Sequence, residues 1–252
     1  MRERDEKRVT HAEIHQVAGL LARAYPYIEA RKRAEGVFAD PPLDSLVRAI
    51  LSQHTSDSNR DRAFAALRAR FRDWNTVADA PVQEVAAALY PVNFAATKAA
   101  RLQEILRRLR DEQGGPTLDF LRDWPTERIR EYLTDFNGVG PKSAAIVCLF
   151  ALGRPVVPVD THVYRVTRRL GWIGPRVSAE RAHAVLGAVI PPSLVLPLHM
   201  GLWEHGRVTC RPRPRCAQCA VYRCCTYEKK TAPEPPVETA IAITAGREAP
   251  AA

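Results

Sequence analysis

The 252-residue sequence lacks a long apolar run, and its charged N-terminal segment has no apolar stretch behind it. We therefore predict no membrane span and no secretory signal. The apolar/polar alternation typical of strands is nearly absent, which argues against a sheet. Acidic residues are outnumbered by basic ones, 28 to 37, and the formal net charge is +9. This balance favours a polyanionic partner, nucleic acid first, although a merely soluble basic protein would share it.

The six cysteines are distributed unevenly. Cys148 stands alone in an apolar run, whereas the other five lie between Cys210 and Cys225. A secreted disulfide framework would spread its cysteines along the chain, so metal ligation in a reducing cytosol is the better interpretation. We therefore expect a cytoplasmic protein.

Helical periodicity dominates the remaining pattern. Apolar residues share one face in four segments, 43–51, 63–71, 100–110 and 160–171. Proline and glycine separate such segments, and the predicted fold class is all-α. The Ala- and Pro-rich tail, residues 231–252, has little to pack and is predicted to be disordered.

The stretch "FNGVGPKSAA", residues 136–145, predicts a tight turn between two helices. Gly138 and Gly140 allow backbone geometry that other residues avoid, and Pro141 suits the first helical position. Exposed N–H groups at a helix start form an anion site, so Gly138, Val139 and Gly140 are candidate contacts to DNA phosphates. An ordinary corner between helices would use the same glycines.

Lys142 follows this turn directly, where the positive end of the helix dipole would favour a neutral, nucleophilic amine. Asp160 is predicted to begin the next helix and could flank the same cleft. A lysine beside a carboxylate suits amine attack on a sugar carbon followed by proton transfer, although the carboxylate opposes the effect of the dipole. The plainer alternatives are a phosphate-contacting lysine and an aspartate that only caps its helix.

The segment "CRPRPRCAQCAVYRCC", residues 210–225, supplies four thiolate candidates: Cys210, Cys216, Cys219 and either Cys224 or Cys225. Structural zinc usually takes two separated Cys-x-x-Cys pairs, and only one is present. A [4Fe–4S] cluster fits this run better, with zinc as the alternative.

Three arginines lie between the first two of these cysteines, namely Arg211, Arg213 and Arg215. They form a basic loop suited to DNA phosphates. Arginines solvated around a purely structural cluster would give the same pattern.

Together these motifs resemble the endonuclease III family of helix-hairpin-helix DNA glycosylases. The resemblance runs through "LVRAILSQHTSD", "VNFAATKAARL", "FNGVGPKSAA", "VPVDTHVYRV" and the cysteine loop, over most of residues 35–230. It implies two helical domains flanking a DNA cleft. A six-helix barrel would span 35–154, and a cluster domain would combine 1–34 with 155–230. It also implies a monomer that binds duplex DNA containing damaged bases or abasic sites.

The resemblance further implies a mechanism. A damaged pyrimidine is flipped out of the duplex, Lys142 attacks C1′ of its sugar to form a Schiff base, and β-elimination cuts the strand. Asp160 assists these steps. The family pattern makes Cys225 the fourth cluster ligand, because "CTYEKK" matches the sequence that follows the cluster, and leaves Cys224 as a spare thiol.

Other DNA contacts implied by the resemblance are Gln53, His54 and Phe94. His54 would fill the space left by the flipped base, where glutamine is common, and Phe94 would enter the opposite strand. Asn93 replaces a glycine before Phe94, and Phe136–Asn137 replaces Leu-Pro before the hairpin. These departures bear on lesion preference.

The alternatives are related glycosylases and two proteins of other classes, a non-catalytic DNA-binding module and a zinc-ribbon protein that binds a partner. An adenine glycosylase would need a glutamate where Ala49 stands, and would lack the hairpin lysine. A glycosylase without lyase activity and a non-catalytic DNA-binding module remain open.

Overall fold

The computed structural model describes residues 9–28 and 40–231. All regular elements in these two ranges are helical, which confirms the all-α prediction for them. None of their helices is both long and apolar enough to cross a membrane. The predicted disordered tail lies, except for Thr231, outside the described residues.

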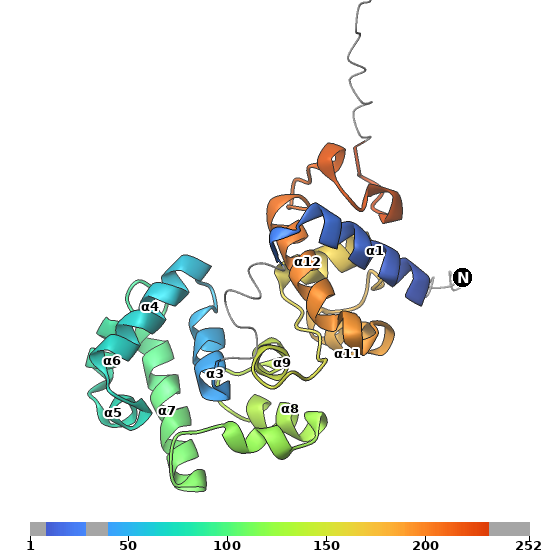
Figure 1. Cartoon of the computed structure of the whole chain (residues 1–252). Helices are drawn as coiled ribbons and strands as arrows, with labels where there is room; N and C mark the ends of the chain where they lie inside the picture. The colour runs from blue at the N-terminus through green and yellow to red at the C-terminus, as the bar shows by residue number, and fades with distance from the viewer. Residues whose placement is uncertain (1–8, 29–39, 232–252) are drawn as a thin grey trace, which may run out of the picture.

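The helices follow one another along the chain as shown in Figure 1. The α-helices are α1 (His11–Ala24), α3 (Pro42–Leu51), α4 (Asp57–Arg70), α5 (Trp74–Asp79), α6 (Val82–Ala88), α7 (Ala95–Gln113), α8 (Thr126–Thr134), α9 (Pro141–Phe150), α10 (Thr161–Arg169), α11 (Ala179–Val189) and α12 (Val195–Val208). Short 3₁₀ helices are η1 (Asp119–Asp123), η2 (Pro192–Leu194), η3 (Cys216–Gln218) and η4 (Tyr222–Cys224).

Helices α3 to α9 enclose one hydrophobic core. Leu46, Leu106 and Ile129 are completely buried in it. The long helix α7 lies against α3, α5 and α6, while α9 packs on α3 and α8. Apolar residues spaced three and four apart give each helix one buried face, and these faces meet in the centre.

Helices α1, α10, α11 and α12 form a second core with Ile14, Val163 and Leu202 fully buried. Helix α12 contacts both α1 and α10. Gly201 permits the close approach to α1, since a Cβ there would lie 3.0 Å from Cβ of Leu21. The cysteine-rich segment after α12 extends this half of the molecule (Figure 1).

Helix α9 belongs to both cores. Val147 and Cys148 are buried in the first core and Leu149 in the second. The same helix contacts α3, α8 and α11, so it lies between the two groups of helices (Figure 1). The division predicted at residues 154–155 falls in the segment between α9 and α10 and stays a prediction about separate domains.

Candidate active site and cysteine loop

The turn between α8 and α9 is a hairpin in which Gly138 is required by its surroundings. Its φ of 80° lies in the left-handed region. A Cβ at this position would lie 2.8 Å from Cδ of Arg101. Gly140 differs, because its φ of −94° and ψ of −179° are extended and no atom would crowd a Cβ. The expectation that Gly140 supplies unusual backbone geometry is therefore wrong.

Val139 anchors the turn. Its side chain is buried, as is that of Phe136, and its N–H donates to the Phe136 carbonyl at 3.0 Å. Within the described part of the chain, the N–H groups of Gly138 and Gly140 have no hydrogen-bond acceptor. An anion at this turn would therefore meet the glycine N–H groups and not that of Val139.

Arg101 of α7 is a candidate anion contact that the sequence pattern did not reveal. Its Nη1 and Nε atoms would lie 3.0 and 3.1 Å from a Cβ on Gly138, so the guanidinium covers the turn. It has no hydrogen bond or ion pair to any residue of the described ranges. Asn137 is tied to the same helix, since its Nδ2 donates to Oε2 of Glu104 at 3.3 Å.

Lys142 and Asp160 stand at the starts of consecutive helices, as predicted. Lys142 is exposed in the first turn of α9. Asp160 caps α10, with Oδ1 accepting from the N–H groups of His162 and Val163 at 2.8 Å each. Its Oδ2 accepts no hydrogen bond from the described residues, and no ion pair joins it to Lys142 there. One carboxylate oxygen thus serves the cap and the other is available.

His199 of α12 connects the surroundings of these two residues. Its ring lies edge-on to Phe150 of α9 at 5.6 Å, and its Nδ1 donates to the Pro158 carbonyl at 3.0 Å. Burial lowers the pKa of His199 to about 4, while the charge of Asp160 acts upward and that of Lys142 downward. Both charged groups therefore lie close enough to influence one buried imidazole.

The exposed loop between α3 and α4 carries Gln53 and His54. Gln53 turns inward, because its Nε2 donates to the Gly138 carbonyl at 2.9 Å and approaches Oγ of Ser143 at 3.5 Å. It therefore links the loop to the hairpin, a contact that the sequence did not reveal. His54 is exposed with φ of 54°.

Phe94, just before α7, is 67% exposed and also left-handed, with φ of 58°. Its ring meets that of His54 edge-to-face, with centroids 6.1 Å apart. The two residues predicted to enter the duplex thus form one aromatic pair. Lys98 and Asn93 both donate hydrogen bonds to the loop of His54.

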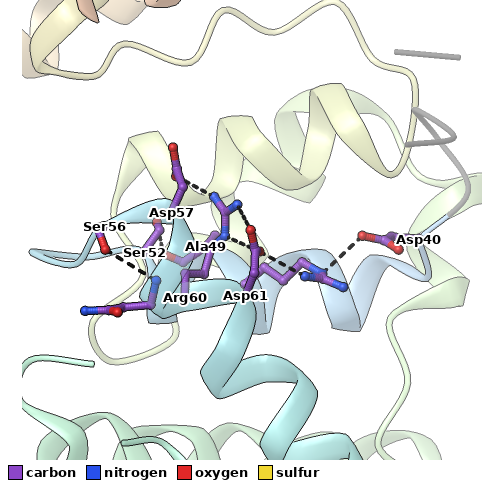
Figure 2. Close-up of polar contacts among 9 residues, drawn as sticks. Asp40, Ala49, Ser52, Ser56, Asp57, Arg60 and Asp61 are labelled. Atoms are coloured by element: carbon purple, nitrogen blue, oxygen red, sulfur yellow. Dashed lines mark hydrogen bonds and ion pairs between the residues drawn. The ribbon is translucent and has the colours of Figure 1, made fainter. Parts of the chain in front are cut away.

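An ion-pair cluster braces the other side of the same loop (Figure 2). Arg48 of α3 reaches Asp40 and Asp61, each at 3.3 Å. Arg60 pairs with Asp57 and Asp61 at 2.8 Å. These contacts join the end of α3 to the start of α4 and limit how far the intervening loop can move.

The cysteine loop surrounds a cavity. Its lining includes four cysteines, Cys210, Cys216, Cys219 and Cys225. Cys224 is not in the lining, and the charge that acts on its thiol is that of Glu13 in α1. The cavity lining thus distinguishes Cys225 from Cys224, two neighbouring thiols that the sequence spacing alone does not tell apart.

The chemistry of these four thiols fits a polynuclear metal centre. Burial and the charges of neighbouring cysteines raise the pKa of Cys219 to about 11, so four thiolates would be unfavourable here without cations between them. Among the described residues, no three His, Cys, Asp or Glu side chains converge on a single metal ion.

Arg169 holds this loop in place. Its guanidinium donates to Sγ of Cys210 at 3.2 Å and to the carbonyls of Arg211 and Pro212 at 2.7 and 3.0 Å. His205 approaches Sγ of Cys219 through Nε2 at 3.5 Å, and the Tyr25 hydroxyl contacts its Nδ1 at 2.8 Å. The side chains of Arg211, Arg213 and Arg215 remain exposed.

Comparison with known proteins agrees with this architecture. The model of the HhH-GPD superfamily of base excision DNA repair proteins matches residues 47–192. Endonuclease III of Thermotoga maritima is 32% identical over 75% of this chain and 84% of its own length. An Arabidopsis thaliana protein named as a DNA glycosylase is 37% identical over 66% of this chain, which spans 57% of that protein.

Solved structures show the same fold. A trapped covalent intermediate of an endonuclease III with DNA superposes with a TM-score of 0.73 at 25% identity, covering 86% of this chain and 96% of that one. A thermostable thymine-DNA glycosylase gives a TM-score of 0.67 at 19% identity, with coverage of 86% and 95%. The chain belongs to the HhH-GPD superfamily of base excision DNA repair proteins and, within it, to the endonuclease III family.

Protonation of His199 should destabilise the fold in acid. The folded chain binds a proton at His199 only near pH 4, whereas the unfolded chain binds it near its ordinary pKa of about 6.5. Stability is therefore lost as the pH falls through this window, by up to about 3 kcal/mol for this group. His199→Asn, whose amide can still donate to the Pro158 carbonyl, should lose less stability as the pH falls through this range.

Urea unfolding at several pH values between about 7 and 4.5 would measure this difference. His15→Asn, at an exposed position on α1, serves as the control and should follow the parent. Equal pH slopes for the parent and His199→Asn would contradict the prediction.

Proposed function

We propose that the chain is a bifunctional DNA glycosylase and abasic-site lyase that removes oxidised pyrimidines from duplex DNA. Family membership makes it a DNA glycosylase; the lyase step and the substrate are the proposal. The observation that carries it is the position of Lys142, exposed in the first turn of α9 after the hairpin, with Asp160 at the start of the next helix, α10. A glycosylase that uses water would not need a lysine there.

The chemistry begins with Nζ of Lys142 attacking C1′ of the flipped nucleotide. The C1′–N bond breaks, and the base leaves with the electron pair and takes up a proton. Opening of the sugar gives a Schiff base to Lys142. Removal of a C2′ proton then breaks the C3′–O bond, and hydrolysis of the Schiff base releases the amine. Oδ2 of Asp160 is the oxygen available to balance charge or carry a proton, because Oδ1 caps α10.

The remaining residues hold the DNA. The N–H groups of Gly138 and Gly140, with Arg101 over the turn, suit one phosphate, and the basic loop at 211–215 suits others. His54 and Phe94 would occupy the space that the flipped base leaves. The net charge of +9 supports DNA as the partner. The proposal also includes a monomer that acts on nucleoid DNA in the cytoplasm.

We also propose that Cys210, Cys216, Cys219 and Cys225 hold a [4Fe–4S] cluster, since they line one cavity. When bound, the cluster supplies a cross-link within the loop that carries the arginines. None of the steps at Lys142 requires it.

Lys142→Ala should abolish covalent trapping by borohydride on a duplex containing thymine glycol, because no amine remains to form the Schiff base. We expect a loss of about 10³-fold or more in trapped complex. Lys142→Arg keeps the positive charge but cannot form the adduct, so it should fail equally. Lys229→Ala changes another exposed lysine and should trap normally.

Trapping that survives in Lys142→Ala would refute its role as nucleophile. Release of free base without any trapping in the parent would indicate a monofunctional glycosylase. Neither product from the parent would indicate a DNA-binding module.

Arg213→Ala should weaken DNA binding similarly for all sequences and reduce the slope of log K against log salt by about 1, because one phosphate contact is lost. Fluorescence anisotropy at several salt concentrations measures this slope. Arg72→Ala is the control, since Arg72 is 90% exposed and pairs with Asp73. An unchanged slope for Arg213→Ala would remove the basic loop from the interface.

Cys225→Ser should eliminate the visible iron–sulfur absorption and lower the thermal stability of the C-terminal half. Cys224→Ser should preserve both, since Cys224 lies outside the cavity lining. Metal analysis and the absorption spectrum of the two purified variants test this choice. The reverse result would make Cys224 the fourth ligand, and zinc in the parent would exclude the cluster.

A further inference from the structure

Lys98 is a buried lysine that the proposed chemistry does not use. It lies on α7 with only 2% of its surface exposed. Its Nζ donates to the carbonyls of Leu51 and Gln53 at 2.9 and 2.6 Å and to Oγ1 of Thr55 at 3.1 Å. A buried ammonium is tolerated only when its protons are matched by acceptors, and here three oxygens of one loop supply them.

The same loop is held from its exposed side by Asn93. Its Nδ2 donates to the His54 carbonyl at 2.5 Å, and its N–H donates to Oγ1 of Thr55 at 3.3 Å. Thr55 in turn donates to the Gln53 carbonyl at 3.2 Å. Both residues flanking His54, and the carbonyl of His54 itself, are therefore fixed.

The main chain of Lys98 also contacts Phe94. Its backbone N–H donates to the carbonyl of Phe94, the N-cap of α7, at 3.0 Å. This is the ordinary i→i−4 bond of the helix, so it is the side chain of Lys98 that joins the first turn of α7, next to Phe94, to the loop of His54.

His54 and Phe94 need such support. Both have left-handed backbones, which are unfavourable for residues other than glycine and persist where the surroundings enforce them. Their rings nevertheless meet at 6.1 Å while Phe94 is largely exposed. The aromatic pair is thus preformed before any DNA arrives.

We propose that Lys98 is a positioning residue that holds His54 and Phe94 together as a single aromatic wedge for entering the DNA duplex. The inference rests on the proposed function. A rigid wedge can fill the space that the flipped nucleotide leaves in the base stack without an entropic cost for ordering its two side chains. More of the binding energy therefore remains for extruding the damaged nucleotide. The wedge acts only on paired DNA, whereas single-stranded DNA has no stack to open.

Lys98→Met tests the proposal, because methionine keeps an apolar stem but no donors. On a thymine glycol duplex we expect single-turnover trapping to fall about 10- to 100-fold. Trapping on a single-stranded abasic oligonucleotide should stay within about twofold of the parent. Added to the double variant His54→Ala/Phe94→Ala, Lys98→Met should have little further effect, since residues that act through one another are not additive.

Gln103→Met is a matched control. Gln103 is equally buried on α7, and its amide donates to the carbonyls of Val77 and Ala80 at 2.8 and 2.7 Å, away from the wedge. Gln103→Met should therefore destabilise the fold without changing the ratio of trapping on duplex DNA to trapping on single-stranded DNA. Should Lys98→Met not fold, Asn93→Ala loosens the same loop from outside and should show the same duplex-selective loss.

A second measurement separates the wedge from the chemistry. With 2-aminopurine opposite a tetrahydrofuran analogue of an abasic site, which cannot form a Schiff base, the parent should raise the fluorescence by unstacking that base, and Lys98→Met should not. This readout does not depend on a Schiff base, so it holds even if the parent proves to lack lyase activity. The proposal would be overturned if Lys98→Met lost trapping equally on duplex and single-stranded DNA, or if its effect added to that of the His54→Ala/Phe94→Ala variant. It would also be overturned if the parent did not unstack 2-aminopurine, or if Lys98→Met unstacked it as well as the parent.

Discussion

Helix α9 packs against two hydrophobic cores at once, and the positions of the candidate catalytic residues depend on that packing. Its buried face contributes Cys148 to one core and Leu149 to the other. The first turn carries Lys142, and Phe150 at its other end contacts His199, which lies beside the segment leading to Asp160. Because a packed helix is rigid, this arrangement keeps the lysine and the carboxylate in one region without a direct ion pair.

The elements around the hairpin are joined by polar contacts. Gln53 ties the loop after α3 to the hairpin, Arg101 covers Gly138, and Lys98 binds the loop of His54. Three segments distant along the chain, the loop after α3, the first half of α7 and the hairpin, are thereby joined.

The cysteine loop depends on Arg169 in a similar way. This one guanidinium binds a cysteine sulfur and two carbonyls of the arginine-rich segment. The loop therefore carries both the four cysteines that line the cavity and the three exposed arginines. Cys225 lines that cavity, whereas Cys224 is not part of its lining.

The features that depend on neighbouring residues could be predicted from the sequence alone. They are the helical faces, the Asp160 cap, the turn before Lys142 and the cluster of thiols. These features depend on neighbours within a few positions. The buried contacts of Lys98, the position of Arg101 over Gly138, the burial of His199, the inward turn of Gln53 and the ordinary backbone of Gly140 emerged only in the folded chain. They arise from contacts between segments far apart in sequence, and burial and distance between such segments exist only once the two cores have packed.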